Sequence, residues 1–275
     1  MNKSGQGFIT FAENTQEHDY LSFALLQAKL LKESNPTSQY AVIVNDLAFE
    51  KINDDHKKYF DHIIRLEEDW NESTSSWKLQ NESQVFQLTP FKETIKLESD
   101  LIIHKDISHW WSALRLRDII ISTGSVNYFG ETNHSNNYRE FFRINDLPDV
   151  YNGLMYFRFS ETAYKFFETA KTIRKNWLQV SKIFKKCNEP VPSTDTLYAI
   201  TARLFGEDLV TLPTLKFFRF CHMKAAHNNF PEGEDWWEYL LFEKDGSVIR
   251  INNERQYYPL HYQNKKFLEY YERNY

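Results

Sequence analysis

The sequence has little cysteine, glycine and proline, and it contains no long apolar run. The two cysteines, Cys187 and Cys221, do not have metal-ligand spacing, so we expect neither a disulfide framework nor a cysteine metal site. Eight glycines and eight prolines exclude collagen-like and proline-rich low-complexity chains. No stretch approaches the roughly 20 apolar residues that cross a bilayer, and the polar start at residues 1–6 does not resemble a secretion signal. We therefore expect a cytoplasmic protein with no membrane segment.

Neither the charge nor the common short motifs assign a function by themselves. The formal net charge of -5 excludes a uniformly basic nucleic-acid coat, although it allows a local basic stripe. We find no Walker-type phosphate loop, no Gly-x-Ser-x-Gly elbow, no His-Glu-x-x-His and no internal repeat. Aromatic residues, in contrast, are abundant, with 22 Phe, 16 Tyr and 7 Trp. Such residues build cores and also stack on sugars and bases.

Alternating apolar and polar segments predict a mixed α/β fold. In the first half we expect strands at 7–12, 41–44, 62–66 and 94–97 (continuing at 101–103), helices at 20–32 and 54–60, and a weakly structured stretch at 67–83. In the second half we expect strands at 119–121, 150–159, 216–222 and 256–261, helices at 110–116, 161–184 and 195–205, and a polar lid or acceptor loop at 124–139. Strands separated by helices imply a mainly parallel sheet, which binds ligands at the carboxyl ends of its strands. Residues 1–228 would form the main domain, and residues 229–275 a small extension packed on it, with a hairpin turn at 244–247 and a terminal helix.

Two acids interrupt the apolar segment Leu97-Glu98-Ser99-Asp100-Leu101. If one strand runs through them, its period of two places both carboxyl groups on one face, where burial is costly unless a cation compensates. A hard divalent ion that also binds phosphate oxygens is the usual compensation. The segment therefore predicts a metal–diphosphate site at a strand end. The alternative is that the strand ends at Leu97 and that a solvated turn follows.

Further segments extend this pattern in a consistent order. They are Lys92 with Leu97-Glu98-Ser99-Asp100, similar to "K-x-x-x-x-L-D-x-D"; Phe8-Ile9-Thr10-Phe11-Ala12 with Tyr20-Leu21; Val150-Tyr151-Asn152-Gly153-Leu154, similar to "F-N-S-G-V"; and Ser193-Thr194-Asp195, similar to "D-Q". Together they resemble metal-dependent glycosyltransferases with the GT-A fold, particularly the glycogenin-like branch, over about three-quarters of the chain. The resemblance implies a Rossmann-like, mixed but mainly parallel sheet flanked by helices, with the catalytic domain in residues 1–228.

The resemblance also implies roles for individual residues. Asp100 would bind the Mn²⁺ or Mg²⁺ ion that bridges the diphosphate of a nucleotide-sugar. Glu98 replaces the usual first Asp and is one methylene longer, so it would hold either the metal, a ribose hydroxyl or a metal-bound water. Asn152 and Asp195 would lie near the transferred sugar as catalytic residues. The implied donor-binding residues are Thr10, Ala12, Tyr20, Lys92, Glu98, Lys224 and Lys266.

A late histidine is usually the third metal ligand in this family. His222 is followed closely by Lys224, and His261 by Lys266, and either lysine could hold a phosphate as a point charge. Neither segment matches the family's "H-x-x-G-x-x-K" completely, since the glycine is missing. We prefer His222 because it follows the helix at Asp195. The alternative for each histidine is an ordinary structural imidazole.

The predicted reaction moves a sugar from a nucleoside-diphosphate sugar to an acceptor hydroxyl. The metal and a lysine would neutralise charge on the departing nucleoside diphosphate while the sugar becomes oxocarbenium-like. An inverting enzyme would use a carboxylate to take the acceptor proton, whereas no strong base is evident in glycogenin-like retaining enzymes. The sequence leaves this choice, the donor and the oligomeric state open.

The helix expected at 161–184 carries a basic stripe. At about 100° per residue, Ile173, Trp177, Val180 and Phe184 fall on one face. Six cations fall on the opposite face: Lys171, Arg174, Lys175, Lys182, Lys185 and Lys186. Such a stripe could follow a phosphate backbone, or it could be an ordinary solvated face. If it binds DNA, the acceptor would be a hydroxymethylated base turned out of the duplex. Trp110, Trp111, Trp236 and Trp237 could form its pocket or belong to the core. The compact, Asn- and Tyr-rich chain also resembles virus-encoded glycosyltransferases that modify such bases.

Two other functions stay open from the sequence. A metal-dependent nucleotidyltransferase can share the same sheet, but it normally has a glycine-rich phosphate loop after the first strand. Here that position holds Glu13-Asn14-Thr15-Gln16, which contains no glycine. A non-catalytic protein that has kept the fold would bind no nucleotide-sugar in the presence of Mn²⁺.

Overall fold

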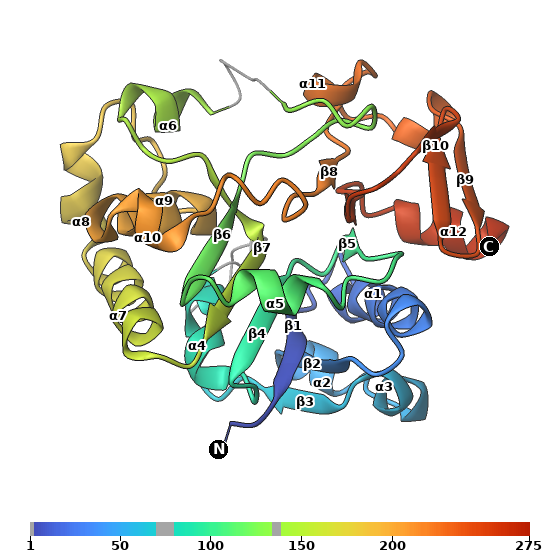
Figure 1. The fold of residues 1–275 in the computed structure, drawn as a ribbon, viewed down its shortest axis with the longest axis horizontal. Coiled ribbons are helices and arrows are strands. Elements are labelled where there is room, and N and C mark those ends of the chain that lie inside the picture. Colours follow the sequence, from blue (N-terminus) through green and yellow to red (C-terminus); the bar gives the residue numbers. More distant parts are fainter. Residues whose placement is uncertain (1–2, 70–79, 134–138) are drawn as a thin grey trace.

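The computed structural model describes residues 3–69, 80–133 and 139–275, and a six-stranded sheet lies at its centre (Figure 1). The strand order is β3-β2-β1-β4-β7-β6. The pairs β1–β2, β2–β3 and β1–β4 are parallel, whereas β7 runs antiparallel to both of its neighbours. The predicted fold class, a mixed and mainly parallel sheet flanked by helices, is confirmed.

The bounds of the elements follow the chain. The strands of the central sheet are β1 (Gln6–Ala12), β2 (Gln39–Val44), β3 (His62–Arg65), β4 (Glu93–Leu97), β6 (Ile119–Thr123) and β7 (Val150–Arg158). The helices around it are α1 (Tyr20–Ser34), α2 (Asp46–Phe49), α3 (Asp54–Tyr59), η1 (Gln80–Gln84), α4 (Val85–Leu88), α5 (Trp110–Leu114), α6 (Glu140–Ile144), α7 (Glu161–Lys175), α8 (Trp177–Val180), η2 (Ser181–Ile183), α9 (Thr194–Phe205) and α10 (Glu207–Val210).

A second, three-stranded sheet and a C-terminal unit complete the fold. The second sheet has the order β5-β12-β8, from β5 (Leu101–Ile102), β12 (Leu260–His261) and β8 (Cys221–His222). The remaining elements are α11 (Ala225–Asn228), η3 (Trp236–Glu238), β9 (Phe242–Asp245), β10 (Val248–Ile251), β11 (Glu254–Arg255) and α12 (Phe267–Asn274). Strands β9, β10 and β11 form an antiparallel sheet, with the predicted turn between β9 and β10.

The central sheet is buried on both faces. Ile9 and Ile43 pack in one apolar cluster with residues of α7 and α9, whereas Phe8 and Val42 pack in another with residues of α1 and α5. Successive strand residues point to opposite faces, so a strand covered on both sides is a continuous apolar run. With both faces covered by helices, the strand ends and their loops are left to build a site.

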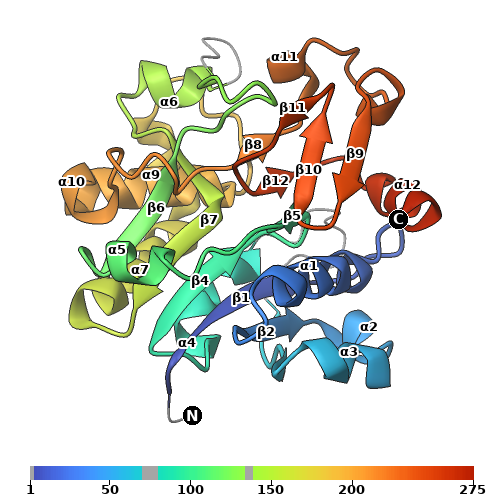
Figure 2. The same cartoon turned by 45° about the vertical axis from the view of Figure 1, so that its right-hand side comes forward.

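The C-terminal segment packs against α1 and returns to the end of β4 (Figure 2). Phe23 of α1 belongs to the same apolar cluster as Trp236 and Phe267. Strand β12 pairs antiparallel with β5 and parallel with β8. The predicted boundary at residue 228 stays a prediction, although this one cluster contains residues from both sides of it. None of the helices in the described ranges has the length and apolar character needed to cross a membrane.

The helix predicted at 161–184 is shorter than expected. Helix α7 ends at Lys175, where the side chain of Asn176 donates a hydrogen bond to the backbone oxygen of Thr172, at 2.8 Å. Asparagine competes in this way for backbone groups and disfavours helix interiors. The chain continues as α8 and η2, so the six cations of the predicted stripe do not share one helix face.

Three predicted strands are also shorter or differently placed. Of the strand expected at 216–222, only β8 is extended, because turns closed by Leu215 and Phe218 precede it. Of the strand expected at 256–261, only β12 remains, after Pro259, which cannot donate a ladder hydrogen bond. The strand at 94–97 does not continue at 101–103, since Leu101 N donates to Glu98 O in a turn and β5 joins the second sheet.

Candidate functional site

Two acids and a histidine meet just beyond the carboxyl end of β4. Glu98 and Asp100 lie in the turn between β4 and β5, and His261 arrives on β12, which pairs with β5. His261 Nε2 lies 3.1 Å from Asp100 Oδ2 and 3.5 Å from Glu98 Oε2. One ligand atom from each of the three residues lies within 4.8 Å of the others. The carboxyl groups therefore come together through a turn, and the predicted strand period of two is not the reason.

Two neighbours hold this turn in place. Gln27 of α1 donates to the backbone oxygen of Glu98 at 2.7 Å and also to that of Leu101. Glu98 N donates to the backbone oxygen of Gly153 in β7 at 3.1 Å. A side chain at Gly153 would put its Cβ 2.9 Å from Glu98 Oε2, so the glycine leaves room for the carboxylate. The turn is thus packed between α1 and β7.

The charges in the cluster act on one another. Burial would raise the pKa of Asp100, but His261 and Lys265 hold the pKa of Asp100 well below its usual range. Lys265 Nζ lies 2.5 Å from Asp100 Oδ2. Burial opposes protonation of His261, but Asp100 and Glu98 outweigh it and raise the pKa of His261. Burial raises the pKa of Glu98, and His261 and Lys96 offset this only in part. Asp100 is therefore the firmly ionised acid of the cluster.

The donor set fits a divalent cation. Carboxylate oxygens suit Mg²⁺ and Mn²⁺, whereas an imidazole nitrogen is the ligand that transition metals accept. Glu98, Asp100 and His261 offer both kinds, and the side chain of Glu98 keeps 26% of its exposure, which leaves the group accessible. The mixed set is therefore compatible with either ion.

A second charged group lies along the start of β7. Asp195, in the first turn of α9, accepts a hydrogen bond from Asn152 N at 2.6 Å and pairs with Arg139. The guanidinium of Arg139 also lies 3.6 Å from the ring centroid of Tyr151. Burial raises the pKa of Asp195, and Arg139 offsets this in part. Asn152 and Asp195 are thus in contact, and Gly153 connects them to Glu98.

A buried ion pair behind Asn152 was not expected from the sequence. Lys96 Nζ lies 3.0 Å from Glu82 Oε2, with side chains only 1% and 6% exposed. Lys96 donates to Asn152 O at 3.2 Å, and Glu82 accepts from Asn152 Nδ2. Glu82 lies in η1, within the stretch that its polar composition marked as weakly structured. The available signal was Lys96 itself, since a lysine inside an apolar strand needs a partner.

Comparisons with known proteins concern the fold. No protein-family model matches the chain, and no curated protein matches it in sequence. The Q189E active-site mutant of LgtC is similar over 94% of this chain and 88% of its own, with 10% identity and a TM-score of 0.50.

The chain has the GT-A fold.

Other structures with a GT-A fold are similar to a lesser degree. The galactosyltransferase LgtC in complex with donor and acceptor sugar analogues matches 75% of this chain and 72% of its own, with 11% identity and a TM-score of 0.49. Mouse xyloside xylosyltransferase 1 matches 76% of this chain and 85% of its own, with 12% identity and a TM-score of 0.49. The chain spans only 39% of the WbbM bifunctional glycosyltransferase.

Within this GT-A fold the geometry favours His261 over the preferred His222. His222 lies on β8, paired with His261 across the sheet, and its ring stacks on that of His261 at 4.6 Å between centroids. Burial, followed by the nearby His261, lowers the pKa of His222 far below its usual value. Only His261 directs a ring nitrogen at both acids among the described residues. The order of elements along the chain was the wrong criterion, because β12 and β8 are neighbours in the sheet.

The lysines also differ from the expectation. Lys265, which was not predicted, contacts Asp100, whereas Lys266 is 73% exposed and lies 3.6 Å from Asp235. Lys224 is largely buried, and burial lowers the pKa of Lys224 to about 8, with Glu98 opposing the shift. Lys92 is exposed at the start of β4, six extended residues or about 20 Å from Glu98. The structure therefore does not bring Lys92 to the site, because β4 runs its full length between them.

The remaining predicted donor residues follow β1. Thr10 is buried and donates to the backbone oxygen of Leu97 at 2.9 Å, next to the acid turn. Ala12 is buried at the carboxyl end of β1. Lys265 Nζ lies 5.2 Å from the ring centroid of Tyr20, which opens α1. Thr10 and Tyr20 thus lie near the turn that carries Glu98 and Asp100, and Ala12 packs in the apolar cluster that contains Leu97 and Leu101.

The four tryptophans considered for a base pocket pack in the interior. Trp110, Trp111 and Trp236 are buried in apolar clusters, as in the alternative given above. Trp237 stacks on Tyr270 of α12 at 5.3 Å between centroids. Of the two alternatives, the structure therefore favours the core, since three of these indoles are buried and Trp237 packs against the same cluster as Trp236.

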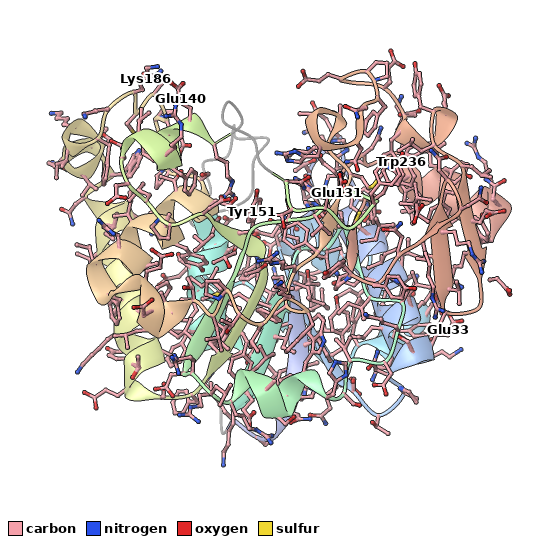
Figure 3. All side chains as sticks on the ribbon, turned by 45° about the horizontal axis from the view of Figure 1, so that its top comes forward. Glu33, Glu131, Glu140, Tyr151, Lys186 and Trp236 are labelled. Carbon is pink, nitrogen blue, oxygen red and sulfur yellow. The ribbon has the colours of Figure 1, made fainter. Side chains whose placement is uncertain are left out.

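The polar loop predicted at 124–139 is described only in part, since residues 134–138 lie outside the described residues. Val126 forms a bridge to β8, and a turn follows in which Gly130 N donates to Asn127 O at 2.9 Å. Arg139, at its end, contacts Asp195. Lys186 pairs with Glu140 at 2.7 Å, on the face where Tyr151 lies nearer the centre (Figure 3).

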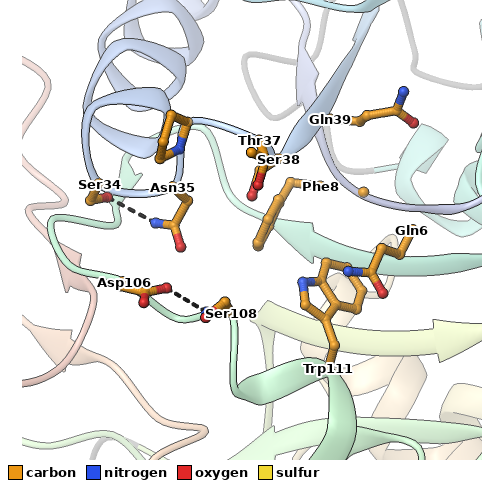
Figure 4. Close-up of a pocket in the computed structure, with 12 residues that line it drawn as sticks. Gln6, Phe8, Ser34, Asn35, Thr37, Ser38, Gln39, Asp106, Ser108 and Trp111 are labelled. Carbon is orange, nitrogen blue, oxygen red and sulfur yellow. Dashed lines mark hydrogen bonds between the residues drawn. The ribbon is translucent and has the colours of Figure 1, made fainter.

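A pocket of about 300 Å³ lies at the opposite, amino edge of the sheet (Figure 4). Gln6 and Gln39, where β1 and β2 begin, help to line it, together with Trp111. Asn35 donates to Ser34 Oγ, and Asp106 accepts from Ser108 N. These four polar residues bond in pairs, and the pocket is lined by one carboxylate, so the carboxyl edge is the better candidate for catalysis.

Proposed function

We propose that the protein is a metal-dependent nucleotide-sugar glycosyltransferase of the glycogenin-like branch. The observation that carries this proposal is the meeting of Glu98, Asp100 and His261 beyond the carboxyl end of β4. Sheets of this kind bind ligands at that edge. The ordered similarity of the chain's motifs to that branch supports the finer assignment.

The donor end of the site consists of charged groups that suit a diphosphate. Asp100 and His261, with Glu98, would hold Mn²⁺ or Mg²⁺, which when bound supplies positive charge beside the departing diphosphate. Lys265, now paired with Asp100, would hold a diphosphate oxygen as a point charge. Tyr20, Thr10 and Ala12 would border the nucleotide.

The sugar end consists of Asn152 and Asp195. Asn152 Oδ1 is buried and has no hydrogen-bond partner among the described residues, so it would accept a bond from a sugar hydroxyl. In the transfer, the bond from the anomeric carbon to the diphosphate oxygen breaks and its electron pair stays on the departing diphosphate. A bond from the anomeric carbon to the acceptor oxygen forms, and the acceptor proton passes to the diphosphate or to solvent. The transferred group would be a hexosyl or pentosyl unit.

A binding panel tests the donor assignment. UDP-glucose, UDP-galactose, UDP-xylose and GDP-mannose are added with and without Mn²⁺, and thermal unfolding is followed. A ligand at a hundredfold excess over its dissociation constant stabilises by about 2.7 kcal/mol. At least one should bind with Mn²⁺ and be slowly hydrolysed to its diphosphate. Binding by none would favour the non-catalytic alternative, while the nucleotidyltransferase alternative is not favoured because residues 13–19 contain no glycine.

We further propose DNA with hydroxymethylated bases as the acceptor. Residues 169–188 contain six cations and no acidic side chain, in a protein of net charge -5. Lys175, Lys182 and Lys185 in this segment are exposed. Cations that contact phosphates make binding depend steeply on salt. Because α7 ends at Lys175, these cations lie along the end of α7, the short helices α8 and η2, and the loop after them.

Charge reversal tests the acceptor. Changing Lys175, Lys182 and Lys185 together to Glu should weaken binding to a DNA duplex. The number of phosphate contacts deduced from the salt dependence of binding should fall by up to about three. Changing Lys57 and Lys58 of α3 to Glu is the matched control and should have less effect. Equal DNA affinity in all three proteins would remove DNA as the acceptor and leave the donor assignment intact.

A further inference from the structure

Asn152 lies where the pairing of β6 with β7 is interrupted. Ile121 pairs with Met155, but the next residue of β6, Ser122, pairs with Tyr151. Residues 152–154 of β7 therefore have no opposite residue on β6. A bulge of this kind leaves backbone groups outside the ladder, and bulges recur next to active sites.

Charged side chains take the place of the missing ladder bonds. Asn152 N donates to Asp195 Oδ1 at 2.6 Å, and Asn152 O accepts from Lys96 Nζ at 3.2 Å. Asn152 Nδ2 donates to Glu82 Oε2. Three of the four polar groups of this asparagine are therefore bound to ionisable side chains, and the fourth, Oδ1, has no partner in the described parts of the chain.

The orientation of the Asn152 amide follows from the chemistry of Glu82. An ionised carboxylate only accepts hydrogen bonds, so it must face the NH₂ group and not the oxygen of the amide. Lys96, at 3.0 Å, compensates the charge of Glu82 inside the protein. Oδ1 is thereby turned away from Glu82 and left as a free acceptor.

Stability alone does not account for this ion pair. A buried pair is often replaced by apolar residues at no loss of stability, since desolvation offsets the attraction. Both side chains are almost completely buried, and both act on the same asparagine. The contact of both side chains with Asn152 therefore needs an explanation other than stability.

We infer that Glu82 and Lys96 are positioning residues that present Asn152 Oδ1 to a hydroxyl of the transferred sugar. This inference rests on the proposed function and adds a specificity device to it. A site built around one hydroxyl binds a sugar lacking that hydroxyl poorly, because the buried acceptor is then left unpaired. The device selects the sugar and leaves the nucleotide unaffected.

The experiment separates sugar from nucleotide. Dissociation constants for UDP-glucose and UDP, and for GDP-mannose and GDP, are measured by calorimetry with Mn²⁺ for the full chain and for Glu82→Gln. Glutamine can donate as well as accept, so it no longer orients the amide. The affinity advantage of the sugar nucleotide over its diphosphate should fall about tenfold, the effect of one hydrogen bond. Affinity for the diphosphate alone should change less than about twofold on the same reasoning.

Two further variants keep the outcome decisive. Glu93→Gln, at the amino end of β4, removes an ion pair with Arg115 without contacting Asn152 and should leave the sugar advantage unchanged. If Glu82→Gln does not fold, Glu82→Leu combined with Lys96→Met removes both charges and should lose the advantage. A full sugar advantage in a folded Glu82 variant, or an equal loss for sugar nucleotide and diphosphate, would overturn the inference. Failure of the unaltered chain to bind any of the four probes would overturn the proposed function and this inference with it.

Discussion

The two edges of the central sheet carry different chemistry, although the same strands reach both. At the carboxyl edge, Glu98, Asp100 and His261 lie within contact of one another and next to Lys265. At the amino edge, a pocket is lined by Gln6, Ser34, Gln39 and their neighbours, whose polar groups are uncharged apart from Asp106. Enclosed space alone therefore does not identify the site, because this pocket is lined by one carboxylate, whereas the carboxyl edge brings two acids, a histidine and a lysine together.

The difference follows from how the chain crosses the sheet. The turn after β4 and the strands β12 and β8 all gather at the carboxyl edge. At the amino edge the chain enters β1 and β2 from Gly5 and from the turn after α1. The crossing thus brings Glu98, His261 and Lys265 to the carboxyl edge, whereas the distant segments that meet at the amino edge, which include Asp106 and Trp111, contribute one carboxylate to its pocket.

Replacing Asp100 should remove the chemistry of the carboxyl edge. Asp100→Asn takes away the ionised ligand, so Mn²⁺ affinity should fall on the order of a hundredfold. Asp106→Asn, the carboxylate of the amino-edge pocket, is the control and should leave the affinity unchanged. Electron paramagnetic resonance of free Mn²⁺ during titration measures both. Equal affinities in the two variants would place the metal elsewhere.

Replacing each of the two stacked histidines in turn should show which one is the metal ligand. His261→Phe keeps an aromatic ring against His222 but removes the nitrogen that faces Asp100, so Mn²⁺ affinity should fall at least about tenfold. His222→Phe keeps the stack and every metal ligand, and its effect should be smaller. Calorimetric titration with MnCl₂ gives both values. The reverse order of effects would restore His222 as the ligand.

Two glycine substitutions should affect the edges in opposite ways. At Gly7, a Cβ would lie 2.4 Å from the buried ring of Phe91, so Gly7→Ala should cost about 2 kcal/mol of stability and spare Mn²⁺ binding. At Gly153 the Cβ would meet the end of the Glu98 side chain, which can move. Gly153→Ala should therefore weaken Mn²⁺ binding with a smaller loss of stability. Urea unfolding and Mn²⁺ titration of both variants check this prediction. Equal losses of stability and equal losses of Mn²⁺ affinity in the two variants would contradict it.

The pKa of the buried His104 is shifted in the opposite direction from that of His261, and this shift should make stability depend on pH. Burial lowers the pKa of His104 to about 4, despite its hydrogen bond to Gln256 O, and the nearby cations Lys105, Lys244 and Arg255 add to the shift. Asp100 and Glu98, in contrast, raise the pKa of His261. The folded state keeps His104 neutral while the unfolded state binds a proton below pH 6.5, so stability is lost as the pH falls from about 6.5 toward 4. Between pH 7 and 5.5 the loss should be about 1 kcal/mol.

His104→Gln isolates this contribution. Glutamine does not titrate, so the variant should lose less stability than the unaltered chain over the same interval. Urea unfolding of both proteins at several pH values gives the difference, in which all other titrating groups cancel. Parallel pH profiles would mean that His104 is protonated in the fold as readily as in the unfolded chain.

The elements that were predicted well are those with a local cause. The apolar runs of β1 and β2 and the helical spacing in α1 are properties of adjacent residues, and the structure has them close to the predicted positions. The differences in bounds also have local causes, such as Asn176 at the end of α7 and Pro259 before β12. Glu82 was missed because a polar composition does not reveal that a short helix is buried beneath β7.

By itself, the sequence determined the α/β class and the acid pair at Glu98 and Asp100, since periodicity and two acids within an apolar run are readable within a few residues. Only the tertiary structure decided that His261 and Lys265 join those acids and that Glu82 and Lys96 hold Asn152. The physical reason is that these contacts depend on which strands become neighbours. That choice is made by packing across the whole chain, where residues more than 100 positions apart compete for the same edge.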